Sequence, residues 1–247
     1  MRTVRVYSDK DLCVGTTVNL QGDAAHHIAR VLRMRTNDRV VLFNGDGQEY
    51  AGVISDINKK TVIINLKQAS SSCTESPLRI TLWHGICRGG RMDYVVQKAT
   101  ELGVHAIQPI FTSRGVVRLD KQRSRKRMTH WQRIIISAAE QSGCSRLPDI
   151  HEPRSLIDCL TTISPGAQYL MLDPKGPTGF GKLMTNSKDM TLLTGPEGGF
   201  TEEECSAAQA AGFQLASLGP RVMRTETAPV VALGIAQNIA GDLGGAR

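Results

Sequence analysis

Two glycine-containing segments in the final third of the sequence have the composition of ligand-binding loops. The first, TGPEGG at Thr194–Gly199, follows an apolar run and precedes the acidic stretch Thr201–Glu204. Glycine lets a backbone approach a ligand closely. A phosphate-binding loop usually adds a cation, and the sequence holds neither a Walker motif nor a GxGxxG fingerprint. The segment therefore fits a neutral or cationic ligand such as S-adenosylmethionine, and it also fits an ordinary strand-to-helix turn.

The second segment, LGPRVMRTETA at Leu218–Ala228, adds charged side chains of both signs. Arg221 and Arg224 lie three positions apart, shortly before Glu226. Arginines beside a methyl donor fit an anionic methyl acceptor, whose charge they would stabilise. The alternative is that they form salt bridges with the acidic stretch at 202–204.

The elements that position these segments alternate between strands and helices after residue 77. Apolar strand-like runs are predicted at 78–86, 104–111, 168–173, 190–195 and 213–219. A helix is predicted over 92–103, with apolar residues at the i, i+3, i+4 and i+7 positions, and another over 127–141. This alternation predicts an α/β domain with a largely parallel sheet and helices on both faces.

The first seventy residues are instead typical of a β-rich domain. Several short strands, a turn at Asn44–Gly47 whose residues accept positive φ, and one short helix at 24–34 indicate a small barrel. The polar, serine-rich stretch Gln68–Pro77 is the best candidate for a linker.

Composition narrows the class of protein further. The formal net charge of +7 and the pI of about 9.3 favour an anionic partner such as nucleic acid. The six cysteines form no CxxC pair, so a structural metal is not expected. No apolar run approaches the length of a membrane span, and the N-terminus has no signal-peptide pattern. We therefore expect a cytoplasmic protein that needs neither a membrane nor a metal.

The C-terminal stretch 227–244 is apolar almost all round, with Pro229 at a position where a first-turn proline is tolerated. Such a helix is buried in a core or in an oligomer interface.

Taken together, these segments closely resemble the RsmE family. The resemblance is carried by LLTGPEGGFTEEE and LGPRVMRTETA, and upstream by RMDYVVQKATELGVHAIQPI, TSRGVVRL, AAEQSG and HHIARVLRMRTNDRVVLFNGDGQEY. These motifs follow the family order and span nearly the whole chain. Two positions depart from the family pattern: Cys144 stands where arginine is common, with Arg146 nearby, and Arg88 stands where lysine is frequent.

The resemblance implies a fold, an activity and partners. It implies a PUA-like β-barrel RNA-binding domain at 1–70 and a SPOUT α/β methyltransferase domain with a deep trefoil knot at 71–247. The implied activity is S-adenosylmethionine-dependent methylation of N3 of a uridine in the decoding region of 16S rRNA. The substrate would be the rRNA within the assembled small ribosomal subunit, and the enzyme would act as a homodimer in the cytoplasm.

Site residues follow by matching this sequence to the family motifs. Arg224, Arg221 and Glu226 are assigned to catalysis, with Arg224 as the first choice for stabilising the uridine anion. Glu140 and Gln141 are further active-site possibilities. Donor binding is assigned to Leu172, Thr194, Gly195, Pro196, Glu197, Gly198, Gly199, Leu218, Gly219, Val222, Met223 and Thr225. RNA binding is assigned to basic residues, namely Arg30, Arg33, Arg35, Arg88, Arg91, Lys121, Arg123, Arg125, Lys126 and Arg127.

Two other functions remain open at this level. One is a SPOUT methyltransferase that acts on another RNA base or on a ribose. The other is a ribosome-assembly factor that binds RNA without catalysis. An intact donor pocket would speak against the second.

Overall fold

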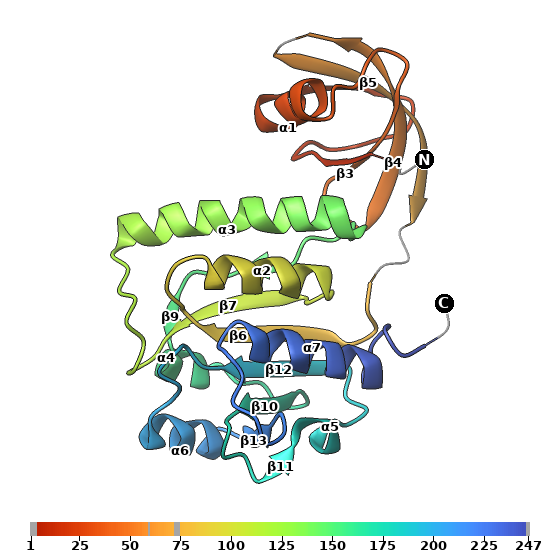
Figure 1. The fold of residues 1–247 in the computed structure, drawn as a ribbon. Helices are drawn as coiled ribbons and strands as arrows, with labels where there is room; N and C mark the ends of the chain where they lie inside the picture. Colours follow the sequence, from red (N-terminus) through yellow and green to blue (C-terminus); the bar gives the residue numbers. More distant parts are fainter. Residues whose placement is uncertain (1–3, 59, 72–74, 246–247) are drawn as a thin grey trace. The chain divides into compact units, whose positions relative to one another are not determined.

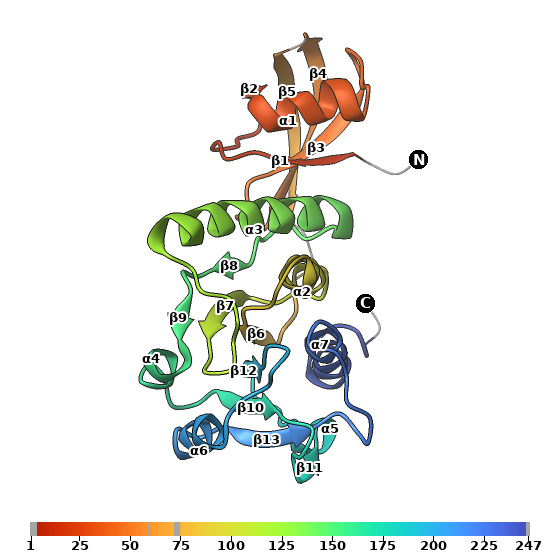
Figure 2. The ribbon, with the colours of Figure 1, turned by 60° about the vertical axis from the view of Figure 1, so that its left-hand side comes forward.

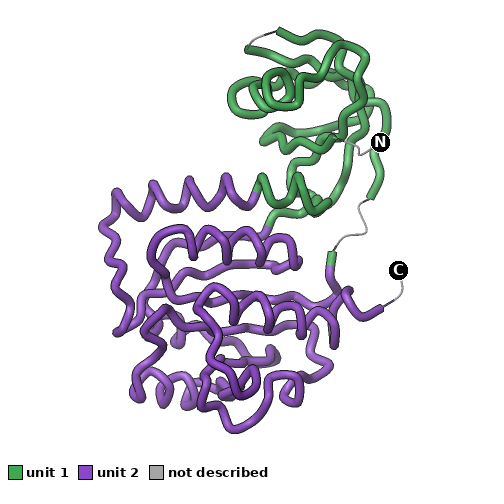
Figure 3. Tube along the Cα trace, viewed as in Figure 1, with its two compact units in different colours: residues 1–75, 136–147 green, residues 76–135, 148–247 purple. Residues whose placement is uncertain are grey.

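The computed structural model describes residues 4–58, 60–71 and 75–245, which fall into two compact units. Unit 1 comprises residues 1–75 and 136–147, and unit 2 comprises residues 76–135 and 148–247 (Figures 1 and 3). The first four residues of the predicted linker, 68–71, are instead the end of a strand. The functional division at residues 70 and 71 stays a prediction.

Unit 1 is built on a sheet with the strand order β1-β3-β4-β5-β2, which has β1 and β2 as its ends. Alternate residues of its strands point into one apolar core, including Val40, Leu42, Ile54, Val62 and Ile64. The elements are β1 (Arg5–Tyr7), β2 (Thr17–Gln21), α1 (Gly22–His26), the π-helix η1 (His27–Val31), β3 (Arg39–Phe43), β4 (Gln48–Ile57) and β5 (Thr61–Ser71).

The predicted turn between two strands is present and joins β3 to β4. Within it only Gly45 and Gly47 take positive φ, at 94° and 88°. The side chain of Asn44 accepts from the Asp46 amide at 3.2 Å, and that of Asp46 accepts from the Gln48 amide at 2.7 Å. The polar side chains thus stabilise the turn locally while the glycines supply its left-handed backbone.

Unit 1 also includes residues 136–147, from much later in the chain, which was not predicted from the sequence. The Arg5 guanidinium donates to the carbonyl oxygens of Ala139, at 2.7 Å, and Cys144, at 3.1 Å. It also pairs with Glu49 at 2.9 Å. Glu140 accepts from the Tyr7 amide at 3.0 Å, so that this carboxylate serves unit 1.

Unit 2 is a parallel α/β domain, as predicted. Its strands follow the order β11-β13-β10-β12-β6-β7-β8, with β9 also paired to β7, and every pairing is parallel. The strands are β6 (Arg79–Gly85), β7 (Ala106–Phe111), β8 (Asp149–Ile150), β9 (Arg154–Ser155), β10 (Gln168–Leu172), β11 (Thr178–Gly179), β12 (Asp189–Thr194) and β13 (Gln214–Ser217).

Helices cover both faces of this sheet, with α2 and α7 on one face and α4 and α6 on the other (Figure 2). The helices are α2 (Arg91–Glu101), α3 (Lys121–Ser142, of which the first part belongs to unit 2), α4 (Leu156–Leu160), α5 (Phe180–Leu183), α6 (Glu202–Ala210) and α7 (Thr227–Ala240). Within the described residues, no helix combines the length and apolar character needed to span a bilayer.

Local sequence explains the buried face of α2 and the start of α6. Helix α2 buries Met92, Val95, Val96 and Ala99, the stripe that the sequence predicts. Helix α6 opens with a capping box, because Thr201 accepts from the Glu204 amide while the Glu204 carboxylate accepts from the Thr201 amide.

Helix α3 starts earlier than its apolar pattern indicates. The basic run from Lys121 to Arg127 forms its first turns, and Asp120 accepts from the Arg123 amide at 2.8 Å. A carboxylate cap at this position satisfies one of the free N–H groups of the first turn, which explains why the helix extends into a charged segment.

Candidate functional site

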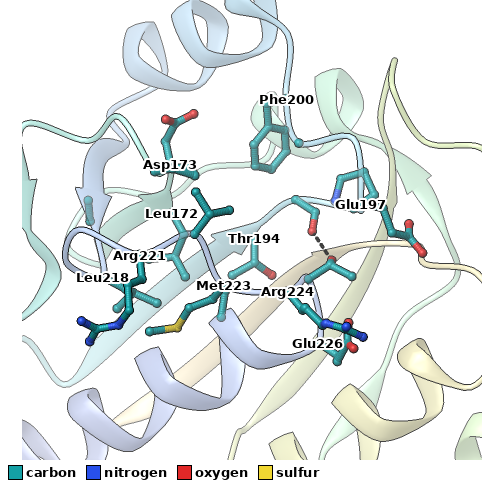
Figure 4. A pocket seen from close by; sticks show the side chains of 18 of the residues that line it. Leu172, Asp173, Thr194, Glu197, Phe200, Leu218, Arg221, Met223, Arg224 and Glu226 are labelled. Carbon is teal, nitrogen blue, oxygen red and sulfur yellow. Dashed lines mark hydrogen bonds between the residues drawn. The ribbon is translucent and has the colours of Figure 1, made fainter.

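A pocket lies at the carboxyl ends of three adjacent strands of unit 2. Strand β10 has β12 on one side and β13 on the other, and the loop after each strand contributes to the pocket wall. In parallel α/β sheets the loops after adjacent strands meet at this edge, which is where ligands bind. The cavity encloses about 430 Å³, within the size range of small-molecule sites (Figure 4).

The residues predicted to hold a methyl donor lie around this pocket, with one exception. The wall includes Leu172, Thr194, Gly195, Pro196, Glu197, Gly199, Leu218, Gly219, Val222, Met223 and Thr225. Gly198 is not part of the wall, because its Cα faces Arg114; a Cβ there would lie 2.9 Å from the Arg114 Cβ. The absence of a side chain at Gly198 lets the loop at 195–199 pack closely against the chain at Arg114.

The residues predicted for catalysis from the second glycine segment also line the pocket. Arg221, Arg224 and Glu226 all contribute to the wall, whereas Glu140 and Gln141 do not and belong to unit 1. Figure 4 shows Arg221 and Glu197 on opposite sides of the cavity.

Arg91, which the sequence analysis predicts to bind RNA, lies in the pocket wall. Its guanidinium donates to Glu197 at 2.7 Å and lies 3.7 Å from Glu226, so it sits between two carboxylates of the wall. The backbone amide of Arg88 donates to the same Glu197 oxygen at 3.0 Å. Burial opposes ionisation of Glu197, but these hydrogen bonds prevail and hold the pKa of its carboxyl below the usual range. Glu197 is therefore a fixed negative charge at neutral pH.

Glu226 has a buried carboxylate oxygen without a hydrogen-bond partner among the described residues. Among the described residues that line the pocket, its Oε2 is a buried side-chain oxygen that lacks a hydrogen-bond partner, although the Arg91 charge is nearby. A buried polar atom without a partner is uncommon and costly, and it often marks a place that a ligand completes.

The loop between β13 and α7 brings an apolar side chain and two cations to the opening. Val222 is 80% exposed, an unusual state for a large apolar side chain, and Arg221 and Arg224 beside it are also exposed. This combination offers an apolar surface and positive charge to a planar, electron-rich group.

Under the pocket lies a buried polar cluster made of His84, Cys87, Thr194 and Thr225. The His84 ring is 2.6 Å from Thr194 Oγ1 through Nδ1 and 3.1 Å from Cys87 Sγ through Nε2. Burial lowers the pKa of His84 to about 4 and raises the pKa of Cys87 to about 12. Both groups are therefore neutral at physiological pH, and the Cys87 thiol is not an activated nucleophile.

His84 should leave a signature in the pH dependence of stability. Burial lowers the pKa of its imidazole from the usual 6.5 to about 4, with the Glu197 charge opposing the change. Since the unfolded chain takes up the proton at higher pH than the folded one, the free energy of unfolding should fall between pH 6.5 and about 4 by roughly 3 kcal/mol. Urea unfolding across this range should show the loss in the wild type and a smaller one in His84→Gln. Parallel curves for the two proteins would contradict the assignment.

The remaining residues predicted to bind RNA are distributed over both units. In unit 1, Arg30 lies on η1, but the helix ends at Val31, and Arg33 has left-handed backbone with a φ of 52°. The helix predicted at 24–34 therefore ends before Arg33, and the side chains of Arg30, Arg33 and Arg35 are exposed. In unit 2, Arg88 is exposed, and the cations of the basic run occupy the start of α3. Arg123 pairs with Asp120 at 3.4 Å.

Among the described residues no group of histidine, cysteine, aspartate and glutamate side chains has an arrangement that could hold a metal ion.

Family models match two parts of this chain. Residues 74–237 match a model described as an RNA methyltransferase domain, and residues 20–67 match one described as an RNA methyltransferase PUA domain. The chain is similar to the ribosomal RNA small subunit methyltransferase E of Bacillus subtilis, with 30% identity over 88% of each chain. The protein of the same name from Synechocystis is 33% identical, over 89% of this chain and 72% of that protein.

Solved structures agree with these matches. A putative methyltransferase from Legionella pneumophila with bound S-adenosylmethionine superposes with a TM-score of 0.94 at 37% identity, covering 98% of this chain and all of that one. A ribosomal RNA small subunit methyltransferase E from Neisseria gonorrhoeae, bound to S-adenosylmethionine, gives a TM-score of 0.92 at 36% identity with the same coverage.

Proposed function

Because this chain belongs to the RsmE family, the ribosomal RNA small subunit methyltransferases E, we propose that it methylates N3 of a decoding-region uridine in 16S rRNA. It is an S-adenosylmethionine-dependent rRNA methyltransferase. The observation that carries the proposal is the pocket of three strand-end loops, with carboxylates in its wall and free arginines at its mouth.

The residues of the pocket fit S-adenosylmethionine. Gly195 and Gly219 let backbone atoms approach a flat purine edge. The wall carries charges of both signs, with Glu197 and Glu226 around Arg91 on one side and Arg221 and Arg224 in the loop before α7. S-adenosylmethionine carries a sulfonium, an ammonium and a carboxylate, so charged groups of both signs suit it. When bound, S-adenosylmethionine supplies an electrophilic methyl group.

The task left to the side chains is to favour the uridine anion. The N3 atom of uridine carries a proton and is a poor nucleophile until that proton leaves. Arg224, and after it Arg221, would stabilise the anion through O2 or O4 of the base. Val222 would pack against the base between them. Glu226, also in the pocket wall, would accept the N3 proton.

Basic side chains outside the pocket would bind the RNA backbone. Five of the first seven residues of α3 are cations, at the helix end where the macrodipole is positive. The positive end of the helix dipole repels these cations. An anionic partner would be attracted both by the cations and by the positive helix end. We propose that this helix end, with Arg30, Arg33 and Arg35 of unit 1, contacts phosphates of the rRNA.

The function can be tested on small ribosomal subunits from a strain that lacks this activity. The full-length protein and labelled S-adenosylmethionine should transfer a methyl group to the 16S rRNA, and mass spectrometry of RNA digests should find N3-methyluridine. A methyl group on ribose or on another base would support the broader class of SPOUT enzyme instead. Donor binding without transfer to subunits or to naked RNA would favour a non-catalytic assembly factor acting on the RNA.

We propose that the loops of the pocket form a trefoil knot. Strand β13 pairs with β10 on the side away from β12, so the chain must return across these strand ends to reach α7, which packs against α2. On the way, Thr225 donates to the carbonyl oxygen of Gly195 at 2.7 Å. An experimental chain trace in which 218–226 passes outside the loop at 195–199 would contradict the knot.

We also propose a homodimer, formed through α7, in the cytoplasm where small subunits are assembled. Helix α7 buries Ala232, Leu233 and Ala236 inside unit 2, while Val231 and Ile235 on the same helix stay partly exposed. Replacing Val231 with glutamate should convert a dimer to a monomer, since it puts a charge into an apolar interface. Light scattering would test this, with Lys182→Glu on α5 as a surface control. A monomeric wild type would rule out the proposal.

A further inference from the structure

We infer that His84 is a positioning residue, whose neutral ring holds two of the loops that form the methyl-donor pocket. The link to methyl-donor binding rests on the proposed function. The contacts that His84 makes within the buried cluster do not depend on it. His84 comes from the end of β6 and does not line the pocket, yet it touches Thr194, which does.

The cluster joins three separate parts of unit 2. His84 contacts Thr194 at the end of β12, and Cys87 lies 3.4 Å from Thr225 Oγ1 in the loop before α7. Thr225 then donates to the Gly195 carbonyl oxygen at 2.7 Å. His84 and Cys87 therefore connect the first glycine loop to the second, and the side chains of His84, Cys87 and Thr194 are buried while Thr225 is partly buried.

Proton positions in the cluster can be assigned by satisfying each group. The Thr225 hydroxyl donates to Gly195, so the thiol hydrogen of Cys87 is shared between Thr225 Oγ1 at 3.4 Å and the Gly85 carbonyl oxygen at 3.1 Å. The Cys87 sulfur is left to accept from Nε2–H of His84. Nδ1 of His84 then has no hydrogen and accepts from the Thr194 hydroxyl. The Thr194 hydroxyl also lies 3.4 Å from the Trp83 carbonyl oxygen. A neutral imidazole, with one donor and one acceptor, satisfies this chain, and burial of the ring disfavours the imidazolium.

This arrangement explains why a titratable residue lies under the pocket without taking part in the chemistry. An apolar residue in place of His84 would leave the buried Thr194 hydroxyl and the Cys87 thiol with poorer partners, which destabilises a compact loop structure. The loops would then sample arrangements in which the backbone atoms of Gly195 and the side chain of Thr225 no longer face the donor together. Donor affinity should fall before the fold is lost.

The first test uses the full-length protein without any ligand. Hydrogen exchange should be measured in the wild type, in His84→Leu, in His84→Gln and in Ile107→Ala, which removes buried apolar atoms from β7 outside the cluster. Amides in 195–199 and 218–226 should exchange at least about tenfold faster in His84→Leu. His84→Gln, which keeps a donor and an acceptor, should recover part of the protection. Equal acceleration in Ile107→Ala at a matched melting temperature would overturn the inference.

The second test links the cluster to donor binding. Calorimetry with S-adenosylmethionine should give a dissociation constant raised at least about tenfold in His84→Leu and less in His84→Gln. Since the effect of His84 passes through Cys87 to Thr225, the losses in His84→Leu and Thr225→Val should be less than additive in the double variant. Additive losses, or normal affinity in His84→Leu, would overturn the role. A wild type that does not bind the donor would instead refute the proposed function, and the exchange experiment would still decide the positioning role.

Discussion

Replacing Arg224 with alanine is expected to lower the rate of methyl transfer roughly a hundredfold or more, while the affinity for S-adenosylmethionine stays near that of the wild type. Arg224 lines the pocket with an exposed guanidinium, in the loop that leads into α7. If it stabilises the uridine anion, its charge matters more in the transition state than in the bound ground state. The loss should therefore appear in kcat and only weakly in donor binding.

The pH dependence and a lysine variant sharpen this prediction. Raising the pH should partly rescue Arg224→Ala, because more uridine ionises without help. Arg224→Lys should recover only part of the rate, since lysine keeps the charge but lacks the planar fork of arginine.

Single-turnover methylation of small subunits at saturating RNA, measured across pH, would check the prediction. Arg118→Ala removes the same charge from an exposed position that does not line the pocket, and should leave the single-turnover rate near that of the wild type. A near-normal rate for Arg224→Ala, or a deficit that does not change with pH, would show that Arg224 only grips the RNA or supports the loop.

Replacing Gly85 with alanine is expected to weaken donor binding by about tenfold to a hundredfold. Gly85 ends β6, directly behind the first glycine loop. A Cβ at this position would lie 2.4 Å from Pro196 Cδ and 2.5 Å from the Pro196 nitrogen. These are backbone and ring atoms that cannot rotate away, so the loop at Gly195 and Pro196 must move away from β6, which alters the pocket wall that both residues form.

The matched control is Gly179→Ala, at the N-cap of α5, where a Cβ meets no atom within 4 Å and the backbone φ of −66° suits alanine. Calorimetry should find wild-type donor affinity in this control and a loss in Gly85→Ala, with both proteins folded by circular dichroism. Unchanged affinity in Gly85→Ala would mean that the loop at Pro196 adapts without reshaping the donor site.

Much of the site could be predicted because its signals are local. TGPEGG and LGPRVMRTETA each follow an apolar strand. A position where the backbone must lie close to another chain segment requires glycine, so it can be recognised from the residue type. The amphipathic stripe of α2 and the glycine turn between β3 and β4 are of the same kind, since residues a few positions apart decide them. The composition of the first glycine segment already fits S-adenosylmethionine, and the resemblance to one family then predicted the donor and the RNA substrate together.

What the sequence could not determine depends on contacts between distant residues. Arg91 reads as one more cation in a basic protein, and only the fold brings it against Glu197, more than a hundred positions away. His84 looks like a strand residue, and only the order of strands places β6 next to β12 and so puts its ring beside Thr194. Likewise the end of α3 belongs to unit 1, where Arg5 donates a hydrogen bond to the Ala139 carbonyl oxygen, and no local sequence pattern predicts this contact.

The physical reason is the same in each case. Backbone geometry and apolar periodicity act over a few residues, so the sequence by itself determined the elements and the loops that end them. The order in which parallel strands pair is set by the packing of the whole domain, and that order decides which loops share a pocket, which charges pair and which polar groups are buried together.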